Sequence, residues 1–152
     1  MKLSTKGRYG LRAIIDMAVH QEADAVSIMS ISQRQGVSEN YLEQIFRLLK
    51  KGGLVSSVRG AGGGYRLAKD PKCVSVGDVL RILEGDLEPV ACGALDSDAG
   101  CEGSDSCVTK YVWKKMNDAI QNAVDSIMLS ELIEESKKKT CENNQYISTC
   151  GN

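Results

Sequence analysis

The sequence of 152 residues lacks any long hydrophobic run. None of its apolar stretches approaches the roughly 18 consecutive residues that a membrane-spanning helix requires. The N-terminal residues also lack the apolar core and the cleavage site of a secretory signal peptide. We therefore expect a cytoplasmic protein without a membrane segment.

Catalytic motifs are missing as well. The only histidine is His20, and no cysteine lies near it in the sequence, which leaves a Cys-His nucleophile pair without support. The run GAGGGY at residues 60–65 is not followed by the Lys-Ser or Lys-Thr pair of a P-loop, and it does not lead into a helix. We predict that the protein is not an enzyme.

Charged residues are divided unevenly along the chain, although the net charge is -1. Residues 1–72 hold 12 Lys and Arg against 6 Asp and Glu, whereas residues 73–152 hold 7 against 14. A basic first half followed by an acidic second half predicts that one end contacts nucleic acid and the other end has a different task.

Residues 38–51 have the pattern of an amphipathic helix. Ser38 is a typical N-cap residue, and Gly52 and Gly53 end the pattern. The apolar residues recur with helical spacing at Leu42, Ile45, Phe46 and Leu49. A shorter helical segment at residues 27–35 precedes this helix across a three-residue turn that contains Gly36, which is the spacing of a helix-turn-helix.

Residues 54–67 predict two short strands joined by a hairpin. β-Branched residues occur in 54–58, the glycines of 60–64 allow a tight turn, and the chain returns at 65–67. A hairpin directly after a recognition helix is a wing. Arg59 at its tip is placed to enter a minor groove or to bind phosphate.

The predicted recognition helix offers polar side chains that donate to or accept from base edges in the major groove of double-stranded DNA. Its expected exposed face carries Glu39, Asn40, Glu43, Gln44 and Arg47. The candidate DNA-contacting residues of the helix and wing are Ser38, Asn40, Tyr41, Glu43, Gln44, Arg47, Arg59 and Gly60.

A long acidic segment follows a short predicted helix at residues 76–83, which Ser75 caps and Gly85 ends. Residues 86–107, the cysteine loop, contain six carboxylates and no Lys or Arg. Loops of this length inside a compact domain are uncommon unless they have a function. This one carries three of the six cysteines, Cys92, Cys101 and Cys107.

The loop cysteines are separated by eight and then five residues, unlike the paired C-x-x-C of most structural zinc sites. Thiolates on one loop are also suitable ligands for an iron-sulfur cluster. Spacing alone leaves a cluster, a zinc ion and redox-active thiols open as alternatives. Of the other cysteines, we expect Cys73 to be half-buried beside the wing and the two tail residues to be bystanders, Cys141 and Cys150.

Residues 108–127 predict a long helix with an apolar stripe that is too wide for a lone surface helix in a small chain. This stripe packs either on the protein's own core or on a second subunit. A short helix is expected at residues 129–135. The polar segment from residue 136 onward is expected to be disordered.

Several motifs resemble the IscR-like family of winged-helix repressors, whose members include NsrR, RirA and CymR. The likeness runs from Met1 to about Leu132 and includes MKLSTKGRYGLRA, QGVSENYLEQ, GLVSSVRGAGGGY and VGDVLRILEG. The loop cysteines fall where cluster-binding members hold theirs, and CymR-like members lack them. The resemblance therefore places the chain in the cluster-binding branch.

This resemblance implies a mainly α-helical fold with a small β-wing, in which a long dimerisation helix follows a winged helix-turn-helix. It implies a homodimer through residues 108–127 that binds a palindromic operator. The implied cofactor is an iron-sulfur cluster on the loop cysteines, 2Fe-2S in preference to 4Fe-4S, and the implied function is repression of cluster-biogenesis genes. The alternative is a cluster-independent, CymR-like regulator of cysteine or sulfur metabolism, controlled by thiol redox state or by a partner.

One position departs from the family. In IscR-like proteins a histidine three residues after the last cysteine completes the cluster site, and Lys110 stands there in this sequence. A protonated lysine has no lone pair for a metal. The fourth ligand is open between a residue of the partner subunit, no protein ligand, and one of the loop carboxylates, Asp98, Glu102 or Asp105.

These patterns divide the chain into four parts. Residues 1–85 are the predicted DNA-binding domain, and residues 86–107 are the cysteine loop. Residues 108–135 contain the dimerisation helix and the short helix after it, and residues 136–152 form the tail.

Overall fold

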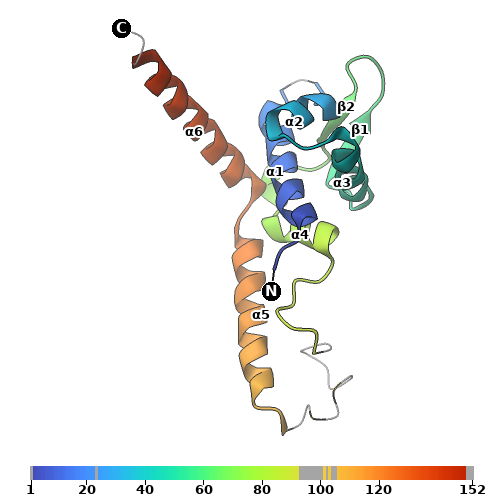
Figure 1. Ribbon diagram of the computed structural model, residues 1–152, viewed down its shortest axis with the longest axis vertical. Coiled ribbons are helices and arrows are strands. Elements are labelled where there is room, and N and C mark those ends of the chain that lie inside the picture. Colours follow the sequence, from blue (N-terminus) through green and yellow to red (C-terminus); the bar gives the residue numbers. More distant parts are fainter. Residues whose placement is uncertain (1, 23, 93–100, 102, 104–105, 150–152) are drawn as a thin grey trace.

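The computed structural model describes residues 2–22, 24–92, 101, 103 and 106–149, with side chains through residue 142. Helices predominate in this part of the chain, and the strands form one antiparallel pair (Figure 1). The elements in chain order are α1 (Thr5–His20), α2 (Ile28–Gln35), α3 (Glu39–Lys51), β1 (Val55–Val58), β2 (Gly64–Leu67), η1 (Pro71–Cys73), α4 (Val76–Glu84), α5 (Thr109–Ser126) and α6 (Leu129–Thr149). The predicted fold class, mainly α-helical with a small β-wing, is confirmed.

Serine side chains cap the helices of the helix-turn-helix. Ser38 accepts a hydrogen bond from the backbone N–H of Tyr41 at the start of α3, and Ser27 accepts one from Ser30 at the start of α2. Gly36 ends α2 with a φ of 65°, a left-handed conformation that glycine adopts without strain. The turn between α2 and α3 is therefore short and fixed, as the sequence predicted.

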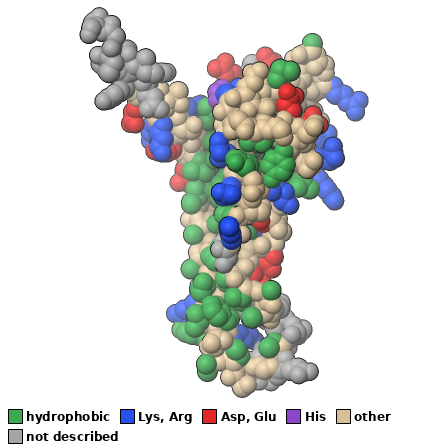
Figure 2. All heavy atoms as spheres, in the orientation of Figure 1, with side chains coloured by type: hydrophobic (Ala, Val, Ile, Leu, Met, Phe, Trp, Pro, Cys, Tyr) green, Lys and Arg blue, Asp and Glu red, His purple; other side chains and the backbone are tan. Residues whose placement is uncertain are grey.

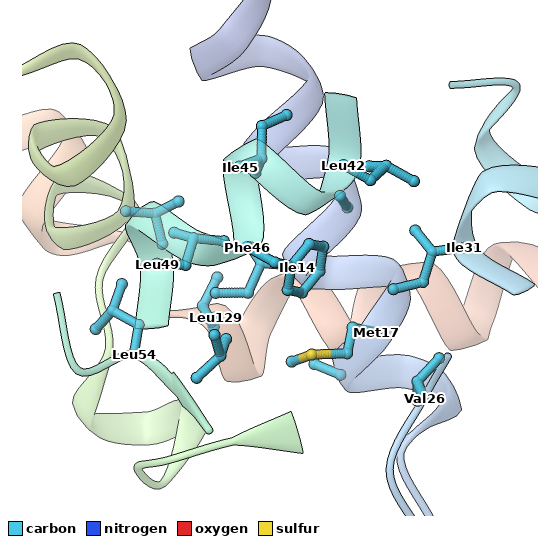
Figure 3. Close-up of a cluster of buried hydrophobic side chains, with 14 of the residues drawn as sticks. Ile14, Met17, Val26, Ile31, Leu42, Ile45, Phe46, Leu49, Leu54 and Leu129 are labelled. Carbon is cyan, nitrogen blue, oxygen red and sulfur yellow. The ribbon is translucent and has the colours of Figure 1, made fainter. Parts of the chain in front are cut away.

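The hydrophobic core lies where α1, α2 and α3 meet (Figure 3). The predicted apolar stripe of α3 is fully buried in it, together with Ile14, Met17 and Ile31 of the other two helices. The ring of Phe46 in α3 lies 4.9 Å from the ring of Tyr65 in the wing, measured between centroids. Since burial of apolar area contributes about 25 cal/mol per Å², this cluster is the main force that holds the recognition helix in place.

The wing is joined to the core at its base. Strands β1 and β2 pair in antiparallel register, with Val58 opposite Gly64 next to the turn. Tyr65 of β2 also exchanges two backbone hydrogen bonds with Val26, of 2.8 and 2.9 Å. The predicted strand-turn-strand unit is present and anchored to the segment before α2.

Helix α4 packs closely against α1. Gly7 and Gly10 face α4, and a Cβ atom at either position would collide with Glu84 or Leu83. Ser4, the N-cap of α1, donates hydrogen bonds from its backbone N–H and its hydroxyl to Oε1 of Glu84, at 3.1 and 2.5 Å. The start of α1 is therefore fixed to the end of α4, next to the point where the chain enters the cysteine loop.

Helices α5 and α6 extend away from the winged domain in opposite directions (Figure 1). None of the residues of α5 is buried, whereas the start of α6 inserts Leu129 and Ile133 into the core. The bounds of α5 lie within one residue of the predicted helix at each end. Neither these two nor any other helix in the described part of the chain has the length and apolar character needed to cross a membrane.

Helix α6 corrects one expectation, because it continues to Thr149 instead of ending at residue 135. The residues from 136 to that point are helical and do not form a disordered tail. Residues 129–149 contain no glycine or proline, and i,i+4 contacts support the exposed turns. Lys139 Nζ lies 4.0 Å from Glu135 Oε1, and the Thr140 hydroxyl donates to the Ser136 carbonyl at 3.0 Å.

Cys73 also differs from expectation. It is the last residue of η1 and is exposed, not half-buried. The next residue, Val74, takes the buried position and is 0% exposed. The apolar side chain, and not the thiol, therefore anchors this turn to the core.

Candidate functional site

Helix α3 presents a polar face to solvent. Five of the candidate DNA-contacting positions at its start and along it are exposed: Ser38, Asn40, Glu43, Gln44 and Arg47. Tyr41 is half-buried, and its ring meets that of Tyr9 edge to face, with centroids 6.5 Å apart. Tyr41 thus connects the polar face of α3 to α1.

The tip of the wing carries Arg59 and Gly60, both exposed. Gly60 has a φ of 109°, and its carbonyl accepts a 3.0 Å hydrogen bond from the N–H of Gly63. A Cβ atom at Gly63 would collide with the carbonyl oxygen of Val58. The turn therefore requires glycine at these two positions, and the result is a narrow tip suited to a nucleic-acid groove.

Basic side chains surround this surface. Figure 2 shows Lys and Arg along the edge formed by α3 and the wing, and a further row over α1. Lys50 near the end of α3 donates a 2.6 Å hydrogen bond to the hydroxyl of Ser57 in β1, which links the recognition helix to the wing. Because phosphate contacts supply most of the non-specific affinity for DNA, a basic surface here favours a duplex partner.

A buried carboxylate fixes the helix-turn-helix to α1. Asp16 is 7% exposed and accepts hydrogen bonds from Nε and Nη2 of Arg34, at 3.0 and 2.8 Å, and from Nε2 of Gln35, at 3.0 Å. The two donor residues end α2, directly before the turn into α3. Asp16 was not predicted as a site residue. The sequence feature that could have identified Asp16 is its place between Ile14 and Met17, on the buried side of α1, where an acidic residue needs a partner.

Arg12 makes a second connection to the same turn. Its guanidinium donates to the side-chain oxygen and the backbone carbonyl of Gln35, at 3.2 and 3.3 Å. It also lies 5.3 Å from the centre of the Tyr9 ring, a cation-π distance. Tyr9, Arg12 and Gln35 therefore join α1, the end of α2 and the start of α3, and they help to set the angle at which the recognition helix is displayed.

The three cysteines of the cysteine loop, Cys92, Cys101 and Cys107, are exposed. Within the ranges that the structure describes, no three metal-ligating side chains lie close enough to form a metal site. Three soft thiols on one segment fit an iron-sulfur cluster chemically, but the structure does not bring them together. The candidate fourth ligands Asp98, Glu102 and Asp105 lie outside the described residues. So does Cys150.

Cys107 lies two residues before the start of α5, where its surroundings favour the thiolate. Its Sγ is 3.1 Å from Oγ1 of Thr109. This hydrogen bond, followed in importance by one from the backbone N–H of Lys110, lowers the pKa of the Cys107 thiol. The thiolate is the form that binds metal ions and attacks oxidants. Lys110 itself is in the first turn of α5, at the position where the family pattern has histidine.

Helices α4 and α5, which the cysteine loop connects, pack against each other. Val76 and Leu80 of α4 form a small apolar cluster with Leu87, and Ile120 and Val124 of α5 pack against it. This contact lies in the C-terminal half of α5. The start of α5, which carries the end of the cysteine loop, extends beyond it (Figure 1).

A polar group that we name the Arg81 clamp lies beside this cluster. Nη2 of Arg81 in α4 donates to Oε1 of Gln121 at 2.5 Å and to Oδ2 of Asp125 at 2.7 Å, both in α5. The hydrogen bond from Arg81 lowers the pKa of the Asp125 carboxyl, and the same bond raises the pKa of Arg81. The clamp joins one residue of α4 to two residues on successive turns of α5.

The opposite side of α5 is apolar and exposed to solvent. Its large residues are Tyr111, Val112 and Met116, and Val108 and Ile127 flank the helix; all five are exposed, by 38–84%. Ala119 and Ala123 share this side by helical spacing and are exposed as well. The predicted stripe therefore divides into a part that packs on α4 and an exposed part, the α5 apolar face. A row of exposed apolar residues of this length marks an interaction surface.

Comparison with protein families gives a match over residues 3–135 to Rrf2, described as an iron-dependent transcriptional regulator. The chain belongs to the Rrf2 family. The HTH-type transcriptional regulator IscR of Escherichia coli O1:K1 is 39% identical over 146 residues, which cover 96% of this chain and 88% of that protein.

Two solved Rrf2 structures share the architecture. IscR of T. potens is 42% identical with a TM-score of 0.72, over 91% of this chain and 90% of that one. CymR, the global cysteine regulator of B. subtilis, is 37% identical with a TM-score of 0.72, over 89% and 98%. This Rrf2 protein is therefore an IscR-like, DNA-binding transcription regulator of winged-helix fold, and not an enzyme.

Proposed function

We propose that this Rrf2 protein is a homodimer that reads a palindromic operator with α3 and the wing, and that an iron-sulfur cluster controls this binding. The observation that carries the proposal is the position of the cysteine loop. This loop connects α4 to α5. Helix α4 is fixed to the winged domain, and α5 has an exposed apolar face. The regulator would repress the genes of iron-sulfur cluster biogenesis, which are the targets that fit a cluster sensor best.

The chemistry of α3 assigns a role to each reading side chain. Asn40 and Gln44 suit the paired donor and acceptor of adenine, and Arg47 suits the two acceptors of guanine. Glu43 accepts a hydrogen bond from the amino group of cytosine and is repelled by phosphate. These roles require α3 to enter the major groove with its N-terminal end toward the bases.

The remaining candidate residues hold the protein on the DNA backbone. Ser38 and Tyr41 lie at the N-terminus of α3, where helix N–H groups favour phosphate. Arg59 enters the adjacent minor groove from the wing tip, where Gly60 allows the close approach of its backbone. Contacts of this kind fix position and orientation more than sequence preference.

The homodimer forms through the α5 apolar face. Two copies of one helix face related by a two-fold axis bury the same residues on both sides. The two recognition helices then lie in successive major grooves, about 34–36 Å apart. An operator with two-fold symmetry matches this arrangement.

The cluster would be held by Cys92, Cys101 and Cys107. When bound, it supplies chemistry that responds to iron, oxygen or nitric oxide. A 2Fe-2S centre is our assignment, from the resemblance to the cluster-binding members. The alternative is 4Fe-4S, because Lys110 leaves the fourth ligand open. Cys107 lies two residues before the first residue of α5, so gathering the three thiols in one place would fix the start of that helix.

Selection from random DNA tests the proposal. The protein is purified anaerobically in cluster-loaded form, and part of it is stripped of iron with a chelator. We expect the loaded form to select a palindrome and the stripped form to bind that palindrome at least fivefold more weakly or more strongly, a coupling of ordinary size. Equal affinities of the two forms would exclude control by the cluster.

A second candidate is a cluster-independent, CymR-like regulator of cysteine or sulfur metabolism, controlled by thiol redox state or by a protein partner. The structural similarity to CymR and the lowered pKa of the Cys107 thiol favour it. Iron-free protein treated with a mild oxidant should then change its operator affinity, and Cys107→Ser should remove that response. A response that requires iron would favour the first candidate.

A further inference from the structure

The connection between α5 and the winged domain is narrow. Helix α5 has no buried residue, and α4 is the element it contacts most. On the α5 side, the apolar part of this contact consists of Ile120 and Val124. At the end of α5, the carbonyl of Ile127 accepts a 2.9 Å hydrogen bond from the N–H of Val76, so this end of the helix is a pivot. Contacts between apolar side chains allow helices to slide and rotate, so the apolar pair does not fix the tilt of α5 about this pivot.

The Arg81 clamp adds a second polar restraint along α5, before this pivot. Its guanidinium binds two α5 side chains four residues apart, Gln121 and Asp125, at 2.5 and 2.7 Å. The other carboxylate oxygen of Asp125 lies directly over Gly77, where a Cβ atom would collide with it. Gln121 is held in turn by its own bond to Asn117, at 3.3 Å. The hydrogen bonds from Arg81 on one side of the carboxylate and the close approach to Gly77 on the other define the rotation and the height of α5 on α4.

Helix α4 is in turn connected to the recognition helix α3 through hydrogen bonds to and from α1. Glu84 binds both hydrogen-bonding groups of Ser4 at the start of α1. Further along α1, Asp16 binds Gln35 at the turn into α3. A change in the angle of α5 on α4 therefore moves each recognition helix relative to the dimer interface.

We propose that Arg81 is a positioning residue that fixes the angle of α5 on α4 and so sets the spacing of the two recognition helices. The inference rests on the proposed dimer and operator. Arg81 and Asp125 are 37% and 47% exposed, so the clamp adds little to the stability of the fold and its removal leaves the domain folded. Its effect is on geometry.

Operators with altered spacing test this directly. The palindrome obtained by selection is compared with versions whose half-sites are moved apart by one or two base pairs. For the wild-type dimer we expect an affinity loss of at least about tenfold, because a rigid dimer loses contacts in one half-site. For Arg81→Gln we expect a loss below about threefold, with tighter binding to the altered operators than wild type.

Lys139→Gln is the matched control, because it removes the cation of an exposed ion pair on α6 and should keep the wild-type spacing penalty. Charge reversal of the clamp, Arg81→Asp with Asp125→Arg, should restore most of the penalty that either single change removes. An unchanged penalty in Arg81→Gln would overturn the inference. So would loss of the dimer in both Arg81→Gln and the milder Asp125→Asn, because the clamp would then be a stability element. A wild-type protein that binds no palindrome would instead contradict the proposed function.

Discussion

Arg59 lies at the tip of the wing, on a turn that Gly60 and Gly63 keep free of other side chains. Replacement by alanine removes a cation and its hydrogen bonds without touching the core. Arg59→Ala is therefore expected to weaken operator binding by about 1–3 kcal/mol with the fold intact. Gel shifts measure the affinity and circular dichroism the fold, with Lys137→Ala on α6 as a control. Unchanged affinity would remove Arg59 from the interface.

Glu43 is exposed in the middle of the polar face of α3. A carboxylate there accepts from cytosine but repels phosphate and the acceptor-rich edge of guanine, so it rejects sequences as well as selecting them. Glu43→Ala should broaden the set of operators recovered in a selection from random DNA. Glu134→Ala, an exposed carboxylate on α6, should leave the set unchanged. Recovery of the wild-type motif by Glu43→Ala would contradict this role.

Single residues also show how far the sequence predicts the site. Ser38 and Arg59 were predictable because capping and turn chemistry are local, and the structure places both at exposed positions. Asp16 was not predicted as a site residue. Its partners lie 18 and 19 residues away in α2, and no local pattern connects them.

Helix α5 depends on a partner for burial of its apolar face. Ala119→Glu or Ala123→Glu would place a charge in the proposed dimer interface, where burying it without a partner is costly. Both variants should be monomers in light scattering. Lys114→Glu places a negative charge on the opposite side of α5 and should stay dimeric. Dimers in both alanine variants would place the interface elsewhere.

The contact between α4 and α5 should depend on pH. The hydrogen bond from Arg81 lowers the pKa of Asp125 on folding. The stability from this pair is therefore complete above the unfolded pKa of about 3.9 and is lost as the pH falls through the lower folded value. The half-exposed pair contributes about 0.2–1 kcal/mol. The difference in urea midpoint between wild type and Asp125→Asn should be present at pH 6 and shrink at pH 3; a constant difference would contradict it.

Elements whose sequence contains caps, an apolar stripe or turn residues were predicted correctly. Elements without such features were not. The serine cap, the apolar stripe and the two glycines at its end mark α3, and the structure gives the helix the expected bounds. The extension of α6 to Thr149 lacked such a signal, because polar residues suit both an exposed helix and a disordered tail. The division of the α5 stripe was also beyond the sequence, since only the position of α4 decides which side is covered.

For the molecule as a whole, the charge division along the sequence corresponds to a division in space. The basic residues 1–72 contain α1, α2, α3 and the two strands of the wing, whereas α5 and α6 belong to the acidic residues 73–152 (Figure 1). Helix α4 lies between the two halves and contacts both α1 and α5. In the proposed mechanism, a signal received by the cysteine loop would reach the recognition helix through α4, which also contacts α3.

The most direct test of this function is the cofactor content of the protein and of its six single cysteine-to-serine variants, all purified anaerobically. We predict visible absorbance and stoichiometric iron and sulfide in the wild type. Cys92→Ser, Cys101→Ser and Cys107→Ser should lose both the cluster and its effect on operator affinity. Cys73→Ser, Cys141→Ser and Cys150→Ser should keep them. A colourless, iron-free wild-type protein that binds its operator equally well with and without added iron and sulfide would contradict the proposed cluster.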